Sequence, residues 1–179
     1  LMEEAARTSG KKVNGWASTD VFGTRDFYAG DYLLRAVSAM LGWGGNDAIE
    51  AFYPMAREDE AGEPLDGANR YQLTFRSLPP AKAFWSVTMY DTSYDGTAGY
   101  LVENPIDRYL INSTTEGLVF GKDGSLTITI QRSQPQETTE VANWLPAPEG
   151  PFYVVLRIYW PEKAALDGTW APPPIRQIG

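Results

Sequence analysis

Residues 152–160, Phe-Tyr-Val-Val-Leu-Arg-Ile-Tyr-Trp, form the longest run of strand-forming residues in the sequence. Alternate side chains of a strand point to opposite faces. One face of this segment would carry five apolar or aromatic residues: Phe152, Val154, Leu156, Ile158 and Trp160. The other face would carry Tyr153, Val155, Arg157 and Tyr159. Because both faces are mostly apolar, the segment predicts a strand in the interior of the protein with cover on both sides, and the rest of the chain would supply that cover.

Composition favours one compact globular domain. The chain has 179 residues, of which 43% are hydrophobic and 21% are charged. This is ordinary for a soluble domain with a real core. Aromatic residues, at 13%, are unusually frequent, and we expect most of these rings in the core. The formal net charge of −8 argues against nucleic acid and anionic membranes as partners. Since no apolar run is long enough to span a bilayer, we also expect no membrane insertion.

The sequence contains no His and no Cys. This composition excludes Ser-His-Asp and Cys-His nucleophilic chemistry within the chain, and it excludes zinc sites of the usual type. An enzyme built from this chain would have to use Asp, Glu, Lys, Tyr or an oxygen-bound metal. We therefore expect no catalysis and no cofactor. The compartment is not determined by these features, although a periplasmic or extracellular location is favoured over a cytoplasmic one.

The clearest predicted helix covers residues 31–41. Asp31 is placed to cap its first turn, and Gly42 is placed to end it. Its apolar residues fall on one stripe, which is typical of a helix that packs against a sheet: Leu33, Leu34, Val37, Met40 and Leu41. We assign residues 1–48 to an N-terminal helical arm and residues 49–179 to one compact β-sandwich.

Short strands separated by Gly and Pro turns fill most of the remaining chain. The predicted strands cover residues 49–53, 71–75, 84–90, 100–102 and 108–111, followed by a hairpin of 118–120 and 125–131 through Asp123-Gly124. The proline-containing segments 144–148 and 172–174 read as extended chain, the second as a surface strap. This pattern predicts a mainly β fold, an antiparallel β-sandwich like a jelly roll, with the N-terminal helix packed against it.

A series of motifs resembles one known family. The motifs run in order through Gly-Glu-Pro-Leu-Asp-Gly at 62–67, Phe-Trp-Ser-Val-Thr-Met-Tyr-Asp at 84–91, Asn-Pro-Ile-Asp-Arg-Tyr at 104–109, Asn-Trp-Leu-Pro-Ala-Pro at 143–148 and Gly-Thr-Trp-Ala-Pro-Pro at 168–173. They are similar to the family called domain of unknown function 1214. The resemblance covers most of the chain and implies a jelly-roll fold, often found after a second domain called domain of unknown function 1254. It implies no particular reaction and no catalytic residues.

Arg157 is the unusual residue of the central strand. A buried Arg is costly unless it is paired, so we expect an acidic partner, either Asp91 or Asp107. A structural ion pair is the favoured interpretation, with ligand binding as the alternative. Arg108 allows the same two interpretations. Asn104, which precedes a proline, is most simply a turn former, although it stays among the candidate ligand-binding residues.

Three further constellations bear on function. Asp91, Asp95, Glu103 and Asp107 could supply the paired carboxylates of a glycoside hydrolase. Trp85, Trp144 and Tyr159 could form a platform that stacks on sugar rings, but burial in the core is favoured for each ring. The acidic loop at 57–69, with Asp59, Glu63 and Asp66, is a weak calcium candidate that does not match an EF-hand; we expect no metal.

The leading hypothesis is therefore a β-sandwich binding or assembly domain without catalysis of its own. One alternative is a hydrolase that acts on a carbohydrate-like substrate through paired carboxylates. A second alternative is a carbohydrate-binding module. The partners left open are a second copy of the chain, a separate partner domain, and a small polar or carbohydrate ligand.

Overall fold

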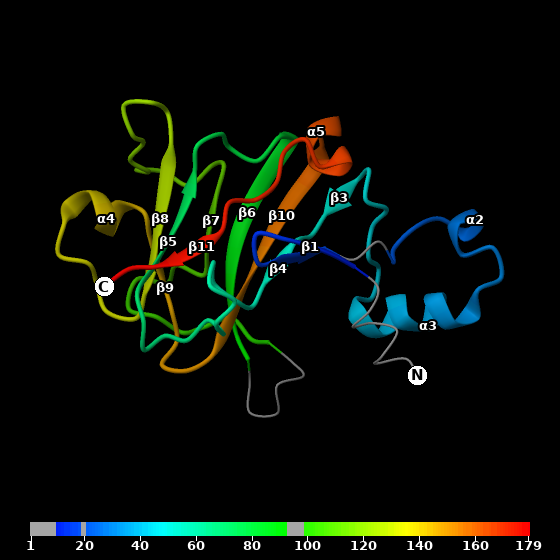
Figure 1. Ribbon diagram of the computed structural model, residues 1–179, viewed down its shortest axis with the longest axis horizontal. Helices are drawn as coiled ribbons and strands as arrows, with labels where there is room; N and C mark the ends of the chain where they lie inside the picture. Colours follow the sequence, from blue (N-terminus) through cyan, green and yellow to red (C-terminus); the bar gives the residue numbers. More distant parts are fainter. Residues whose placement is uncertain (1–9, 19–20, 93–98) are drawn as a thin grey trace.

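Two β-sheets face each other across a single core, with a small helical arm at one side (Figure 1). The computed structural model describes residues 10–18, 21–92 and 99–179. The larger, seven-stranded sheet has the order β1 (Lys11–Val13), β2 (Trp16–Ser18), β4 (Met55–Ala56), β10 (Phe152–Pro161), β6 (Ala81–Asp91) and β7 (Leu110–Asn112), with β3 (Ala51–Phe52) also paired to β10. The smaller sheet has the order β11 (Ile175–Gln177), β5 (Tyr71–Phe75), β8 (Leu126–Gln131) and β9 (Trp144–Pro146). The prediction of a mainly β, sandwich-like fold is confirmed, whereas the finer jelly-roll assignment stays a prediction.

Strand β10 is the centre of the large sheet, as its sequence predicts. It pairs with β6 on one side and with β3 and β4 on the other. Its core-facing residues Val154, Leu156 and Ile158 are completely buried. Trp160 is an exception to the predicted alternation, because the β10–β6 register shifts next to it and its φ of 53° turns it outward. This bulge leaves the ring 64% exposed instead of placing it in the core.

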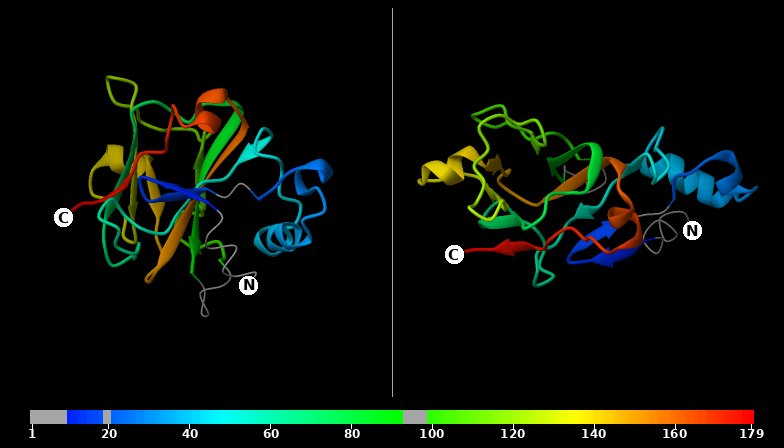
Figure 2. Two further views of the ribbon diagram at one scale, coloured as in Figure 1. Left: turned by 45° about the vertical axis from the view of Figure 1, so that its right-hand side comes forward. Right: turned by 90° about the horizontal axis from the view of Figure 1, so that it is seen from above.

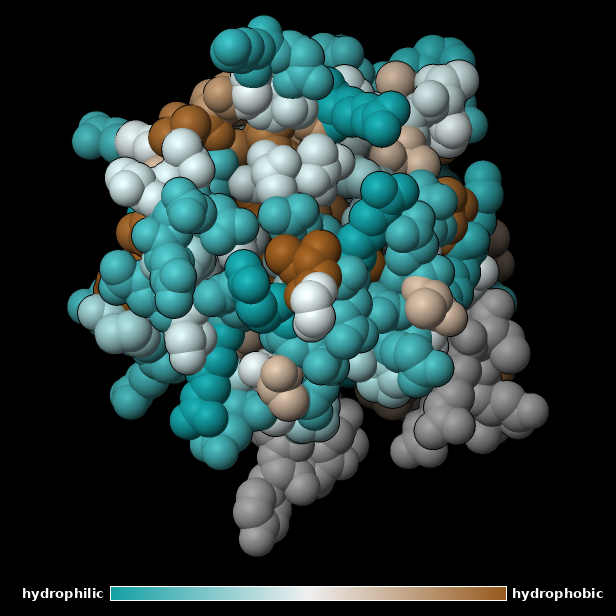
Figure 3. All heavy atoms as spheres, turned by 60° about the vertical axis from the view of Figure 1, so that its left-hand side comes forward, coloured by the Kyte–Doolittle hydropathy of each residue, from teal (hydrophilic) through white to brown (hydrophobic). Residues whose placement is uncertain are grey.

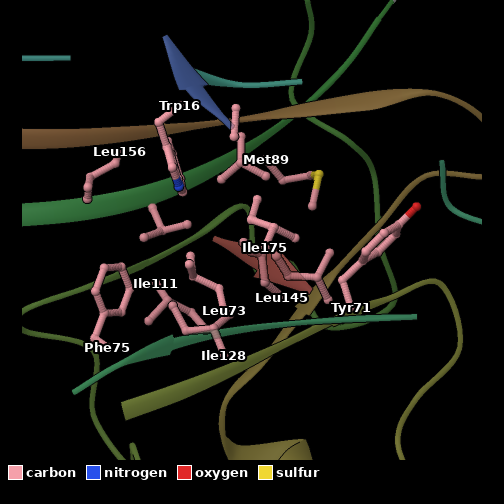
Figure 4. Packing of buried hydrophobic residues seen from close by; sticks show 14 of the residues in the cluster. Trp16, Tyr71, Leu73, Phe75, Met89, Ile111, Ile128, Leu145, Leu156 and Ile175 are labelled. Carbon is pink, nitrogen blue, oxygen red and sulfur yellow. The ribbon is translucent and has the colours of Figure 1, made fainter. Parts of the chain in front are cut away.

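The core contains side chains from segments near both ends of the chain. Figure 4 shows Trp16 of β2 and Ile175 of β11 among the packed side chains between the sheets. The Trp16 indole Nε1 donates a hydrogen bond of 2.7 Å to the carbonyl oxygen of Pro173. The C-terminal segment is thus more than the surface strap that its prolines predict, because it ends in a strand whose Ile175 is fully buried.

Residues 11–18 belong to the large sheet, although we assigned them to the arm. Asn14 and Gly15 both have positive φ, 53° and 83°, and connect β1 to β2 through a two-residue turn. Asn-Gly is the preferred sequence for such a turn because both positions need the left-handed conformation. The second strand of this hairpin pairs with β4, so the arm proper begins after it.

The arm consists of α2 (Arg25–Tyr28) and α3 (Tyr32–Leu41), which extend to one side of the strands in the two views of Figure 2. The predicted ends of the longer helix are confirmed. The Asp31 carboxylate accepts a 2.9 Å hydrogen bond from the Leu34 backbone N–H, and Gly42 follows the last helical residue. The expected packing of its apolar stripe on the sheet is limited, because Val37 and Ser38 are the buried residues of α3. Ser38 Oγ donates to the carbonyl oxygen of Val21.

Two predicted strands are absent from the described residues, and two short helices that were not predicted are present. Residues 100–102 and 118–120 are not strands, although the predicted turn exists and Gly121 N–H donates to the Ser125 carbonyl at 2.8 Å. Helix α4 (Thr138–Ala142) leads into β9, which lies parallel to β8, and α5 (Lys163–Asp167) follows β10. None of the helices within the described ranges has the length and apolar character that a membrane crossing requires.

Candidate functional site

The side of the large sheet that faces away from the core carries an unusual set of side chains. We call this surface the outer face. Its residues come from β10, β6 and the segments around β3 and β4: Tyr53, Arg57, Phe84, Ser86, Thr88, Tyr90, Tyr153, Val155, Arg157 and Tyr159. Strand pairing sets Tyr153 opposite Tyr90 and Arg157 opposite Ser86. Cross-strand neighbours on one face contact each other, so this register brings the residues together.

A row of rings and guanidinium groups crosses the outer face. The Arg57 Cζ lies 4.4 Å from the centroid of the Tyr153 ring. The Tyr153 ring stacks on the Tyr90 ring, with centroids 5.3 Å apart and an interplanar angle of 14°. Arg157 Nη2 then donates a hydrogen bond of 2.8 Å to the Tyr90 hydroxyl, and its Cζ lies 5.5 Å from that ring. The row therefore places one cationic side chain at each of its ends.

A second group of rings lies beside this row, toward the other end of β10. The rings of Tyr159 and Phe84 stack at 4.4 Å with an interplanar angle of 27°. The Tyr53 ring contacts Tyr159 edge-on, with centroids 6.0 Å apart. Asn46, in the segment that leaves the arm, donates to the Tyr53 hydroxyl at 3.4 Å. The outer face thus combines two arginines with two groups of contacting aromatic rings.

Burial raises the pKa of two of the phenols, Tyr53 and Tyr153. Burial raises the pKa of Tyr53, and the nearby Tyr159 hydroxyl raises it further against the opposing effect of Arg157. Burial also raises the pKa of Tyr153, although Arg57 and Arg157 both oppose this shift. At neutral pH these hydroxyls are hydrogen-bond donors and acceptors without charge.

The predicted acidic partner of Arg157 is replaced by a tyrosine. Within the described ranges, no carboxylate oxygen lies within 4.0 Å of a side-chain nitrogen of Arg57 or Arg157. Both predicted partners, Asp91 and Asp107, are among the described residues, so neither forms an ion pair with Arg157. The Asp91 Oδ1 accepts a 2.9 Å hydrogen bond from the Tyr100 N–H. Asp107 is exposed in a turn with φ of 51°. The expected ion pair is therefore wrong, because the register sets Tyr90 within reach of Arg157.

Asn104 and Arg108 have structural contacts. The Asn104 side chain donates to the Val102 and Arg108 carbonyls and accepts from the N–H groups of Ile106 and Arg108. Arg108 Nη1 donates to the carbonyl oxygens of Ala142 and Trp144 at 2.9 and 3.0 Å, where α4 ends. A cation at a helix C-terminus is stabilising, so Arg108 stabilises the end of α4. Asn104 holds the turn at 104–108 through its four hydrogen bonds to backbone groups.

The candidate sugar platform is divided between the core and the surface. Trp85 and Trp144 are buried, with 4% and 1% of their surfaces exposed. The Trp144 Nε1 donates to the carbonyl oxygen of Gln131 at 2.8 Å. Only Tyr159 of the three candidate rings lies on the outer face, so the three do not form one stacking surface.

The acidic constellations do not converge. The buried Asp59 carboxylate accepts hydrogen bonds from the N–H groups of Ala61 and Glu63, and Asp66 accepts one from Ala68. Across residues 10–18, 21–92 and 99–179, no three acidic side chains lie close enough together to hold a metal ion. The calcium candidate is therefore not supported by the geometry. Of the proposed hydrolase acids, Asp95 lies outside the described residues and Glu103 is exposed.

Of the aromatic and cationic residues of the outer face, the sequence identified Arg157 and Tyr159 as candidate site residues but not the other five: Tyr53, Arg57, Phe84, Tyr90 and Tyr153. The alternation of residues 152–160 was the available signal, because it places two tyrosines on the same face as Arg157. The strands that would lie beside this face could not be read from the same pattern.

Comparison with known proteins supports the family and the fold. Residues 50–163 match the family described as "Protein of unknown function (DUF1214)". No curated protein matches the chain. The solved structure of the VPA0106 protein from Vibrio parahaemolyticus is similar over 99% of this chain and 42% of its own, with 29% identity and a TM-score of 0.75. A putative uncharacterized protein from Burkholderia cenocepacia matches 75% of this chain and 31% of its own, with 19% identity and a TM-score of 0.47. The chain thus spans less than half the length of these two proteins, and by its family match it belongs to the DUF1214 family.

Proposed function

We propose that this chain is a non-catalytic assembly domain that associates with a second copy of itself through the helical arm. The observation that carries the proposal is the exposure of the apolar residues of the arm. They are Phe27, Tyr32, Leu33, Met40, Leu41, Trp43 and Ile49. Apolar patches of this kind on a folded protein commonly mark interaction sites.

The apolar stripe of α3 shows most clearly that the arm leaves apolar side chains exposed to water. Leu33, Met40 and Leu41 remain 39%, 46% and 45% exposed, although they fall on the stripe that a globular helix normally buries. Trp43, directly after the helix, is 96% exposed. By contrast, the side of the molecule that carries the small sheet is mostly hydrophilic (Figure 3). Burial of the arm against an apolar partner would remove this surface from water.

A groove beside the arm offers a second part of the same surface. It has a volume of about 690 Å³ and lies between the arm, the N-terminal hairpin and the segment after β10. Its apolar lining includes Phe22, Phe27, Ile49, Leu166 and Trp170. An identical arm from a second copy could place apolar side chains in this groove, as in the self-complementary contacts of two-fold dimers.

The non-catalytic part of the proposal rests on composition and on the contacts of the candidate acids. The sequence lacks imidazole and thiol groups. Asp91 and Asp59 accept hydrogen bonds from backbone N–H groups, which is a structural use of a carboxylate. The hydrolase alternative and the carbohydrate-binding alternative therefore have less support than assembly.

Light scattering coupled to size-exclusion chromatography tests the proposal directly. We expect the protein to be dimeric at high concentration and the double variant Met40→Gln/Leu41→Gln to be monomeric at the same concentration. The matched pair Leu33→Gln and Leu78→Gln separates the arm from general surface hydrophobicity, because both side chains are 39% exposed. Only the arm variant should weaken the dimer. A wild-type monomer at every concentration, or equal weakening by Leu78→Gln, would overturn the proposal, and circular dichroism would verify that each variant is folded.

A further inference from the structure

We propose that the outer face binds an organic carboxylate attached to a ring, with Arg57 and Arg157 as the anion-binding groups and the neighbouring tyrosines as donors and stacking partners. This inference is independent of assembly through the arm, since the two surfaces share no residues. It assigns a ligand class to two cationic side chains whose described contacts are with tyrosines and not with carboxylates.

Neither arginine of the outer face forms an ion pair with a described carboxylate. Three of the nine described arginines do form ion pairs: Arg70 with Glu140, Arg132 with Glu149, and Arg176 with Glu60. Arg57 and Arg157 instead contact tyrosine rings, and no described carboxylate lies within 4.0 Å of them. In a protein with a net charge of −8, two such cations on one face make a local site for an anion.

The contacts of the two arginines leave N–H and O–H donors available for a ligand. The Arg57 Cζ lies over the Tyr153 ring, and a contact with a ring face does not occupy all five guanidinium N–H groups, so some of them can still donate hydrogen bonds to a ligand. Arg157 Nη2 donates to the Tyr90 oxygen, and the Tyr90 hydroxyl proton is then free to be donated onward. An Arg N–H and a Tyr O–H thus converge beside the middle of β10.

The floor of this surface is buried. Ser86, Thr88 and Val155 lie between the larger side chains of the outer face and are only 7%, 4% and 6% exposed. Hydrogen bonds between a guanidinium and a carboxylate are about twice as strong as neutral ones, and partial removal of water strengthens them further. An anion bound to Arg157 would lie beside these covered residues instead of fully in solvent, and this shielding would strengthen its hydrogen bonds.

The ligand class follows from the neighbours of the two cations. Tyr159 lies two residues after Arg157 on the same face, about 7 Å further along the strand, and it stacks with the half-exposed Phe84. These rings suit a flat or ring-shaped body. Inorganic phosphate has no ring, so it would lack the contact with these side chains that a ring-bearing carboxylate could make. Aromatic acids and sugar acids share this chemistry.

Isothermal titration calorimetry with defined probes tests the inference. We expect benzoate or glucuronate to bind, inorganic phosphate to bind more weakly, and neutral glucose not to bind. Added salt should weaken binding because an ion pair is involved. Stronger binding of benzoate would indicate aromatic acids, whereas stronger binding of glucuronate would indicate sugar acids. If neither acid binds the folded protein at millimolar concentration, the inference is wrong.

Three variants locate the site, and a fourth variant serves as the control. Arg57→Gln removes an exposed charge, Tyr90→Phe removes only a hydroxyl, and Arg157→Lys keeps the charge but loses the planar fork. Each should weaken binding by about tenfold or more, since each loses a charge-assisted or charge-oriented hydrogen bond. Arg132→Gln removes an arginine whose partner is Glu149 and should leave binding unchanged. Full binding by both Arg57→Gln and Tyr90→Phe would refute the site, and unchanged light scattering of these variants would separate this result from that of the arm.

Discussion

Replacing Asn143 with Asp should destabilise the fold strongly at pH 7 and less at acid pH. The Asn143 side chain is 4% exposed and joins three segments. Its Oδ1 accepts a 2.9 Å hydrogen bond from the Val119 N–H, and its Nδ2 donates to the carbonyl oxygens of Val119 and Thr127 at 2.7 and 3.0 Å. A carboxylate has nearly the same shape but no N–H group, so two carbonyl oxygens would face a negatively charged oxygen.

The expected cost at pH 7 is about 3 kcal/mol, since each buried group that loses its partner costs about 1–3 kcal/mol and the Val119 segment is partly exposed. The new carboxyl can donate one hydrogen bond when it is protonated. Its pKa in the folded protein should therefore lie above the ordinary value of about 4. For a raised pKa, the stabilisation is present below the ordinary pKa and is lost as pH rises through the raised one. The deficit should be smaller at pH 4 than at pH 7.

Urea unfolding followed by tryptophan fluorescence at both pH values measures these free energies. Asn112→Asp is the matched control. The Asn112 Oδ1 only accepts hydrogen bonds, from the Thr114 N–H and from the hydroxyls of Thr114 and Thr115. A carboxylate accepts equally well, so this variant should change stability by less than about 0.5 kcal/mol. If Asn143→Asp costs no more than Asn112→Asp, or if its cost does not depend on pH, the reasoning is refuted.

Three further predictions concern the turn, the phenols and the tryptophans. Gly15→Ala should lower stability by about 1–3 kcal/mol in thermal unfolding, because φ at this position is +83° and a Cβ would lie 3.1 Å from a backbone oxygen; an unchanged melting temperature would contradict this. Because the pKa of Tyr53 is raised, the stabilisation of its neutral form is present below pH of about 10 and is lost as pH rises through the raised value. Tyr53→Phe should thus reduce the loss of stability in alkali, and equal alkaline unfolding curves would argue against it. Trp144→Phe should cost about 1–3 kcal/mol in urea unfolding because a buried carbonyl loses its donor, whereas Trp160→Phe, at a ring 64% exposed, should be nearly neutral; similar costs would be evidence against this assignment.

The elements with long local patterns could be predicted from the sequence. Strand β5 at 71–75, most of β10 and the helix at 32–41 all carry an uninterrupted period of apolar residues and clear ends. The strands of three residues or fewer carry no such period, so β1 and β2 were missed. The Asn14-Gly15 turn was the signal that could have identified them.

Other errors arose where contacts between residues far apart in the chain decide the local structure. The segment at 118–120 has the composition of a strand, but the Asn143 amide bonds to the backbone of Val119. Trp160 continues the apolar alternation of β10, but a register shift turns it outward. Neither effect leaves a local trace, because both depend on residues that are distant in the sequence.

The sequence by itself determined the mainly β class, the central place of residues 152–160 and the cap of the arm helix, since these depend on neighbours within a few positions. Only the tertiary structure decided what surrounds Arg157 and what the arm leaves uncovered. Strand pairing joins residues far apart in the chain, and a shift of one residue exchanges the two faces of a strand. Tyr90 therefore meets Arg157 and Tyr153 because of the β6–β10 register, and the exposed side of α3 follows from how far the arm extends from the sheets.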